Sequence, residues 1–220
     1  MKNILLCPSM MCANFSNLKE EVRLLDNAGA DIFHMDIMDG SFVPNFGMGL
    51  QDFELVRRVT KKTVDVHLMI ENPCNYVEKF ADMGADIIYI HPESDKQPAR
   101  TLDIIQNKGK KAGIAINPST SIESVQELFP LIDYLMVMTV NPGFAGQKYL
   151  DYVTSKIKKI NSLKDDFHFE IMVDGAISPE KIQELRLLGV KGFILGTSAL
   201  FGKEESYERI LQNLKGGGSK

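Results

Sequence analysis

The chain has 220 residues, of which 44% are hydrophobic and 25% charged, and its net charge is −4. This length fits one domain that buries roughly 70% of the surface its unfolded chain would expose. The excess of acidic residues argues against a nucleic-acid partner, because binding a phosphate backbone requires a basic face. No apolar run approaches the ~18 residues of a membrane span, and no signal-peptide cleavage site follows the N-terminal stretch. We therefore expect a cytoplasmic protein without a membrane partner.

The three cysteines are Cys7, Cys12 and Cys74, an odd number without a CxxC pair. This usage fits a reducing compartment such as the cytosol. The simplest expectation is that all three are small core residues.

Short apolar, β-branched runs alternate with amphipathic stretches of helical period along the whole chain. Strands are expected near residues 4–9, 32–37, 64–69, 86–90, 113–116, 134–139, 169–174 and 192–195. Helices are expected near residues 16–28, 51–59, 73–83, 97–108, 121–128, 148–162, 178–188 and 204–214.

Eight strand–helix units without an intervening linker predict a single (β/α)8 TIM barrel over residues 1–215, with a flexible tail at 216–220. An open doubly wound sheet is the alternative. Such sheets usually carry about five to seven strands, and no GxGxxG follows the first expected strand here.

Polar residues alternate with apolar ones in three of the expected strands. The period of two puts His34 and Asp36 of the second strand on the face opposite its large apolar residues, and Asp65 and His67 of the third strand likewise. By the same parity, Asp174 points inward at the end of the seventh strand. Chemistry in this fold is located at the carboxyl ends of the strands, so these side chains are expected to meet there.

Two histidines and two aspartates form a plausible ligand set for zinc, manganese, iron or cobalt. A single histidine would more simply be a satisfied core residue. Matching parity on three strands instead favours one divalent metal held by His34, Asp36, His67 and Asp174. A buried carboxylate is costly unless it is paired or bound to a metal, which points the same way.

Methionines occupy inward positions near three strand tips, at Met38, Met69 and Met138. Ordinary core packing is the default interpretation of such residues. The functional alternative is a dry pocket wall that keeps water from a reactive carbanion. His91, at the end of the fourth expected strand, is placed to contact a substrate.

Glycines follow three neighbouring strands and predict a phosphate site. Asn141–Gln147 contains Gly143 and Gly146, whose backbone amides can approach an anion closely. Gly175 follows the seventh strand, and a short helix expected after Gly196 would offer its N-terminus. Phosphate sites built from the loops after the last two strands recur in this fold.

Motifs in this order and spacing resemble the ribulose-phosphate 3-epimerase family over nearly the whole chain. They are PSM (8–10), HMDIMDGSFVPN (34–45), DVHLM (65–69), VMTVNPGFAGQ (137–147), VDGAIS (173–178) and GTSALF (196–201). The resemblance implies a metal-dependent barrel enzyme that inverts C3 of a ketose phosphate and forms dimers or hexamers. It implies His34, Asp36, His67 and Asp174 as metal ligands, and Asp36 and Asp174 as the acid/base pair. The implied substrate contacts are Ser9, His67, Gly143, Phe144, Ala145, Gly146, Gly175, Ala176, Thr197 and Ser198.

The residue chemistry agrees with this resemblance. Inverting C3 needs two carboxyl groups on opposite faces of the carbon, one ionised and one protonated. A metal would act as a Lewis acid and stabilise a cis-enediolate, while the phosphate positions C3. No nicotinamide, flavin or pyridoxal phosphate is required.

Several positions depart from the commoner ribulose-phosphate pattern and resemble the allulose-6-phosphate 3-epimerase branch. They are GFAGQ for GFGGQ, DGA for DGG, GTSALF for a GSA-type run, Met11–Cys12 after the first strand and HPE at 91–93. We therefore favour allulose 6-phosphate and fructose 6-phosphate over ribulose 5-phosphate and xylulose 5-phosphate. Another phosphate-binding barrel enzyme, or a non-catalytic sugar-phosphate binder, is the more remote alternative.

The segment 41–47 after the second strand carries apolar Phe42, Val43 and Phe46. It can serve as a lid over the substrate or as part of a subunit interface, and the sequence does not choose between them.

Overall fold

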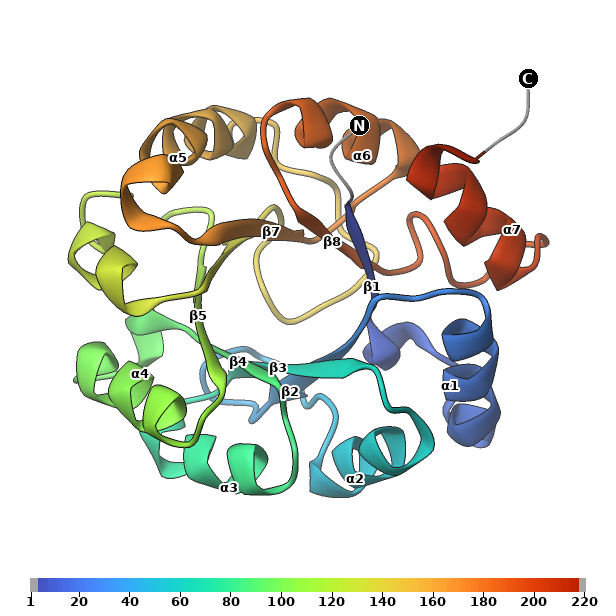
Figure 1. The fold of residues 1–220 in the computed structure, drawn as a ribbon, viewed down its shortest axis with the longest axis horizontal. Coiled ribbons are helices and arrows are strands. Elements are labelled where there is room, and N and C mark those ends of the chain that lie inside the picture. Colours follow the sequence, from blue (N-terminus) through green and yellow to red (C-terminus); the bar gives the residue numbers. More distant parts are fainter. Residues whose placement is uncertain (1–3, 218–220) are drawn as a thin grey trace.

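The computed structural model describes residues 4–217 and shows a ring of parallel strands surrounded by helices (Figure 1). The strands are β1 (Leu5–Pro8), β2 (Ile32–Met38), β3 (Thr63–Met69), β4 (Ile87–Ile90), β5 (Lys111–Ile116), β6 (Tyr134–Met138), β7 (Glu170–Asp174) and β8 (Gly192–Leu195). All eight expected strands are present, and the TIM-barrel prediction is confirmed.

The helices are α1 (Leu18–Asn27), α2 (Leu50–Val59), α3 (Val77–Asp82), α4 (Pro98–Asn107), α5 (Val153–Phe167), α6 (Pro179–Leu187) and α7 (Tyr207–Gln212). α5 begins later than expected, because the segment before it returns to β6 and the Leu150 amide donates to the Thr139 carbonyl at 2.9 Å. Of the tail expected at 216–220, residues 218–220 lie outside the described part of the chain. Gly216 and Gly217 before them lie at the end of the segment Asn213–Gly217, in which Gly216 leaves the helical conformation with φ 90°.

The α-helix expected at 121–128 is wrong. The structure has a 3-10 helix at Gln126–Leu131 with Pro130 inside it, and Pro has no N–H for an α-helical bond. Upstream, the Ser121 hydroxyl accepts from the Ser124 amide at 3.2 Å, and the Ser124 hydroxyl donates to the Ser121 carbonyl at 2.8 Å. Such side-chain bonds compete with helical ones.

The strands follow one another around the barrel in the order β1-β8-β7-β6-β5-β4-β3-β2. The seam between β1 and β2 is closed by a parallel bridge between Ser9 and His34. Across β2 and β3, His34 is opposite Asp65 and Asp36 is opposite His67. The seam and this register place four polar residues of β2 and β3 beside Ser9, which follows β1.

The two faces of each strand bury different cores. Phe33 and Met35 of β2 belong to the large outer core between strands and helices. Inside the barrel, Tyr89, Met136 and Met172 belong to a second, apolar core. The polar residues lie next to this core, toward the carboxyl ends of the strands. The predicted inward and outward parity of β2 and β3 is therefore confirmed.

The cysteines only partly follow expectation. Cys7 is buried inside the barrel, but Cys74 is exposed, because it lies in the surface 3-10 turn Pro73–Asn75. Cys12 is half-buried and lines a cavity described below. The expectation of three core cysteines is correct only for Cys7.

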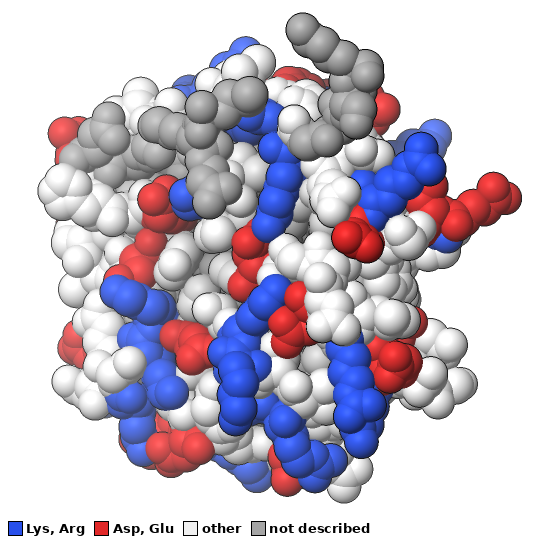
Figure 2. Space-filling view, turned by 45° about the vertical axis from the view of Figure 1, so that its right-hand side comes forward, with Lys and Arg blue, Asp and Glu red and all other residues white. Residues whose placement is uncertain are grey.

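Basic and acidic side chains are interspersed over the face drawn in Figure 2. Within residues 4–217, no helix combines the length and apolar character needed to cross a membrane.

Candidate active site

Four side chains from three strands meet near the carboxyl end of the barrel. His34 and Asp36 come from β2, His67 from β3 and Asp174 from the end of β7. His34 Nε2 lies 3.2 Å from Asp36 Oδ1, and His67 Nδ1 lies 3.4 Å from the same oxygen and 3.6 Å from Asp174 Oδ2. One ligand atom from each residue lies within 4.8 Å of the other three. The structure thus brings together all four residues that the sequence assigned to a metal.

The chemistry of this cluster fits a divalent transition metal. His34 Nε2 and His67 Nδ1 are buried, and neither has a hydrogen-bond partner in the described chain. A buried polar atom without a partner is costly and calls for an explanation. Two imidazole nitrogens and two carboxylates form a ligand set that such ions accept.

Charge interactions within the cluster favour an ionised Asp36. Burial on its own would raise the pKa of the Asp36 carboxyl, but His34 and His67 hold that pKa well below its usual range. Burial lowers the pKa of His34, but the nearby Asp65 and Asp36 carboxylates outweigh burial and raise it. Burial is also the main reason that the pKa of Asp65 is raised.

Each histidine of the cluster has a partner behind it. His34 Nδ1 lies 2.7 Å from Asp65 Oδ1, and His67 Nε2 lies 2.9 Å from His91 Nε2. The sequence placed Asp65 inside the barrel without a role, and placed His91 near the substrate. His91 is instead fully buried behind His67, with the ring of Phe42 packed on it at 4.8 Å between centroids. Burial lowers the pKa of His91 to about 4.

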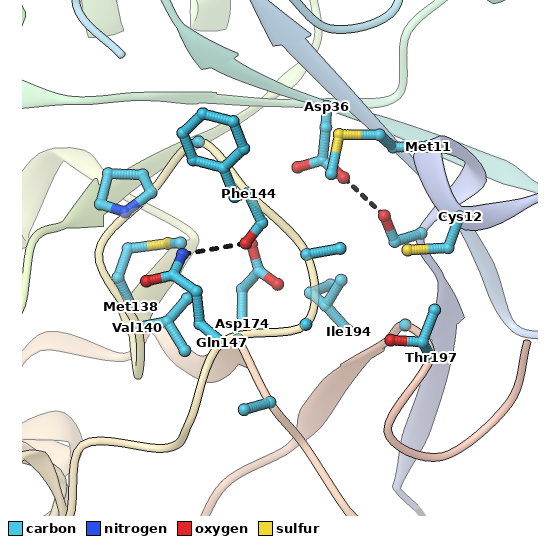
Figure 3. Close-up of a pocket in the computed structure, with 18 of the residues that line it drawn as sticks. Met11, Cys12, Asp36, Met138, Val140, Phe144, Gln147, Asp174, Ile194 and Thr197 are labelled. Atoms are coloured by element: carbon cyan, nitrogen blue, oxygen red, sulfur yellow. Dashed lines mark hydrogen bonds between the residues drawn. The ribbon is translucent and has the colours of Figure 1, made fainter. Parts of the chain in front are cut away.

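A cavity opens above the cluster. Asp36 and Asp174 line it from different strands, and Figure 3 shows both side chains directed into it. The Ser9 hydroxyl donates to Asp36 Oδ2 at 2.6 Å. His34 and His67 are fully buried and are not among the residues that line the cavity, so of the expected substrate contacts His67 alone lies behind its wall.

The three glycine-bearing loops also border the cavity. The predicted contacts that line it are Ser9, Gly143, Phe144, Ala145, Gly146, Gly175, Ala176, Thr197 and Ser198. Gly143, Gly146 and Gly175 have φ of 122°, 79° and 114°, which a side chain would strain. The Gln147 amide donates to the Phe144 carbonyl at 2.9 Å (Figure 3) and to the Asn141 carbonyl at 2.6 Å, and so fixes the β6 loop.

The short helix expected after β8 is wrong. Thr197–Gly202 forms turns, and the amides of Leu200 and Phe201 both donate to the Gly196 carbonyl. Gly202 has φ 71°, in the left-handed region, which ends the segment before a helix is established. Thr197 and Ser198 still reach the cavity, but from a turn.

Met38, Met69 and Met138 are buried and line the cavity, a position that fits both core packing and a pocket wall. Sequence reasoning gave no such role to Val140, Gln147, Ile177 or Ile194, which line it as well. Their position in loops or at strand ends next to predicted contacts is the only sequence signal that could have found them.

The β2 loop contacts the β6 loop at Gly143. Asn45 Nδ2 donates to the Gly143 carbonyl at 2.7 Å, and Val43 is buried against Gly143. Phe46 in the same loop is 79% exposed. The loop therefore contacts a cavity-lining segment and also presents apolar surface, so both the lid and the interface stay open as predictions.

Comparisons with known proteins agree with this geometry. The profile of the Ribulose-phosphate 3 epimerase family matches residues 5–201. A ribulose-phosphate 3-epimerase of Synechocystis sp. is 42% identical over 213 residues, covering 95% of this chain and 92% of that protein. One of Bacillus subtilis is 38% identical over 210 residues, covering 94% and 96%.

Solved structures support the fold alone. A 3-hexulose-6-phosphate synthase superposes with a TM-score of 0.71 at 14% identity, covering 98% of this chain and 100% of that one. The identity is too low to carry function, but the family match spans nearly the whole barrel and all four cluster residues. The chain therefore belongs to the ribulose-phosphate 3-epimerase family and is an isomerase.

Proposed function

We propose that this protein inverts C3 of a ketose phosphate, with D-ribulose 5-phosphate and D-xylulose 5-phosphate as its substrate pair. The observation that carries the proposal is the pair Asp36 and Asp174. Their carboxylates come from β2 and β7, are directed into one cavity and share the buried nitrogen of His67 between them. Two carboxyl groups around one cavity are what proton removal on one face and proton return on the other require.

In this proposal, one aspartate removes the C3 proton and the other, protonated, delivers a proton to the opposite face. When the epimer is the substrate the two roles exchange, because the reaction is reversible. The Ser9 hydroxyl keeps Asp36 in place through its 2.6 Å bond to Oδ2, which directs Oδ1 toward the histidines. The methionine side chains keep water away from the reacting carbon, so C3 is reprotonated by the second aspartate and not by a solvent molecule.

His34, Asp36, His67 and Asp174 would hold one divalent metal ion. When bound, the metal supplies Lewis-acid stabilisation of the negative charge that develops on the substrate oxygens. The support for this is the pair of unpartnered buried nitrogens and the donor set itself. The donor set does not select among zinc, manganese, iron and cobalt.

The glycine-bearing loops would hold the phosphate. Backbone amides around Gly143–Gly146, Gly175–Ala176 and Thr197–Ser198 border the end of the cavity formed by β6, β7 and β8. Successive amides near residues with positive φ form concave anion sites. Binding the phosphate there fixes the distance of C3 from the two carboxylates.

The preference for allulose 6-phosphate drawn from the sequence lacks support from the relatives, because the Synechocystis and Bacillus proteins are named ribulose-phosphate 3-epimerases. The pentulose phosphate is therefore the first candidate. One observation retains the hexulose phosphate as the second. Several positions that depart from the commoner pattern line the cavity, among them Met11, Cys12, Ala145, Ala176 and Thr197.

The test is proton NMR in D2O with metal-loaded protein, run separately on ribulose 5-phosphate and allulose 6-phosphate. Faster C3 deuterium uptake with xylulose 5-phosphate as product supports the first candidate. Faster formation of fructose 6-phosphate supports the second. Absence of C3 exchange with both would contradict the proposed epimerisation.

A further inference from the structure

On the side of His67 that faces away from the ligand cluster, a chain of polar contacts leads to His91 and Glu93. The proposed reaction does not involve these contacts. His67 Nε2 lies 2.9 Å from His91 Nε2, and the two ring planes are tilted by only 24°. His91 Nδ1 lies 3.4 Å from Glu93 Oε2 and has no hydrogen bond of ordinary geometry in the described chain. The contacts therefore run from the ligand cluster through one imidazole to a carboxylate.

The carboxylate at the end of this chain is held in one orientation. Glu93 Oε1 accepts from the Asn117 amide at 2.8 Å and from the Thr120 hydroxyl, which leaves Oε2 facing His91. Lys156 secures the same loop, because its ammonium donates to the carbonyls of Asn117, Pro118 and Thr120 at 3.0, 2.8 and 2.6 Å. Glu93 cannot turn away from His91 without breaking these bonds.

These contacts order the protons on the side of His67 that faces away from the ligand cluster. A carboxylate only accepts hydrogen bonds, so Glu93 favours a proton on the His91 nitrogen that faces it. A neutral imidazole has one donor nitrogen and one acceptor nitrogen, so His91 Nε2 is the acceptor. His67 Nε2 must then be the donor, which leaves His67 Nδ1 as the nitrogen that can offer its lone pair to a metal. That nitrogen is the one beside Asp36 and Asp174.

We propose that Glu93, acting through His91, is a positioning residue that fixes the proton of His67 on Nε2 and keeps the Nδ1 lone pair directed at the ligand cluster. His91 is a positioning residue for the same reason. The other histidine needs no intermediary, because Asp65 contacts His34 directly at 2.7 Å. The inference rests on the proposed function only in taking the four-residue cluster as a metal site.

Glu93→Gln tests the proposal with little change in shape. The Gln carbonyl can keep the bonds from Asn117 and Thr120, so its NH2 group faces His91 Nδ1. His91 Nδ1 then becomes an acceptor, His91 Nε2 a donor and His67 Nε2 an acceptor. His67 is left with its proton on Nδ1, where the metal should bind. We expect the Kd for Zn2+, measured by competition with a chromogenic chelator, to rise about 10- to 100-fold.

The decisive readout needs neither metal nor substrate. Long-range 1H–15N spectra of metal-free protein distinguish the two imidazole tautomers, and the chain has only four histidines to assign. We expect His67 Nε2 to carry a proton in the wild type and to lose it in Glu93→Gln. A wild-type His67 without a proton on Nε2, or an Nε2 proton unchanged by Glu93→Gln, would overturn the proposal. Lack of C3 exchange would overturn the proposed function but not this result.

Two variants of His91 and one distant control complete the test. In His91→Gln the side-chain carbonyl can still accept from His67 Nε2, so zinc affinity should remain near that of the wild type. His91→Leu has no acceptor and should weaken zinc binding as Glu93→Gln does. Glu21→Gln alters a glutamate that accepts from Tyr207 at 2.7 Å, far from the cavity, and should leave zinc affinity unchanged. Equal zinc affinities of His91→Leu and His91→Gln would contradict the role of the acceptor.

Discussion

The cavity has two ends built on different principles. At the ligand end, His34, Asp36 and His67 project from the middle of buried strands, and each contacts at least one other polar side chain. At the loop end, the cavity is bordered by glycines and exposed backbone, as at Gly146. Strands fix side chains precisely enough for proton transfer, whereas loops offer amides that can adapt to a phosphate. The comparison predicts that changes at the ligand end reduce kcat, and changes at the loop end raise KM.

The largest effect is expected from the two carboxylates. Asp36→Asn and Asp174→Asn each remove a group that takes or gives a proton, and general acid–base groups contribute about 10²- to 10⁴-fold. We expect kcat to fall by at least about 10³-fold. The control Asp151→Asn changes an aspartate that is 89% exposed and should leave kcat unchanged. The measurement is steady-state kinetics together with a thermal melt, and near-normal turnover in either variant would refute the two-base scheme.

The second-largest effect on activity is expected from removing the metal from the ligand end. Treatment with a chelator should abolish C3 exchange, and adding back a divalent transition metal should restore it. Because the metal binds only the folded cluster, saturation at about 100 times Kd should add about 2.7 kcal/mol to the free energy of unfolding. The check is exchange activity and melting temperature in the same samples. Full activity in a preparation shown to be metal-free would exclude the Lewis-acid role.

A smaller effect is expected one contact away from the ligands. Asp65→Leu removes the carboxylate that contacts His34 Nδ1 and leaves that nitrogen without its partner. Loss of such a partner typically costs 10- to 100-fold in metal affinity, so we expect a Kd for Zn2+ raised by about that factor. Asp65→Asn keeps an acceptor and should lose less. Equal zinc affinities of Asp65→Leu and the wild type would show that strand packing alone orients His34.

The sequence predicted the ligand end better than its supporting residues. Parity alone placed His34, Asp36 and His67 inside the barrel, because side chains of a strand alternate strictly. Parity does not reveal register between strands, so the pairing of His34 with Asp65 could not be read from the sequence. His91 was misplaced for a related reason. The ring of Phe42, 49 positions earlier in the chain, covers it, and no local pattern encodes that contact.

Loops were harder to predict than strands because their conformation depends on a few backbone angles. The turn after β8 replaced an expected helix, and Gly202 at φ 71° contributes to that outcome. The helix expected at 121–128 does not form for a similar local reason. Pro130 lies inside the 3-10 helix found there, and the Ser121 hydroxyl forms a local hydrogen bond upstream. The glycines of the loop end were correctly placed at the cavity, whereas the shape of the loops was not predictable from composition.

The smallest effect offers the sharpest test of the loop end. Gly146 and Gly109 have φ of 79° and 70°, and a Cβ on either would meet nothing within 4 Å. Placing alanine in this left-handed conformation costs about 1–2 kcal/mol, so Gly146→Ala and Gly109→Ala should lower the free energy of unfolding by similar amounts. Only Gly146 borders the cavity, whereas Gly109 follows α4 on the way to β5. We therefore expect Gly146→Ala to raise KM for the sugar phosphate severalfold with little change in kcat, and Gly109→Ala to change neither. If both variants destabilise equally and neither alters KM, the β6 loop does not bind the phosphate. The prediction that changes at the loop end raise KM would then be wrong.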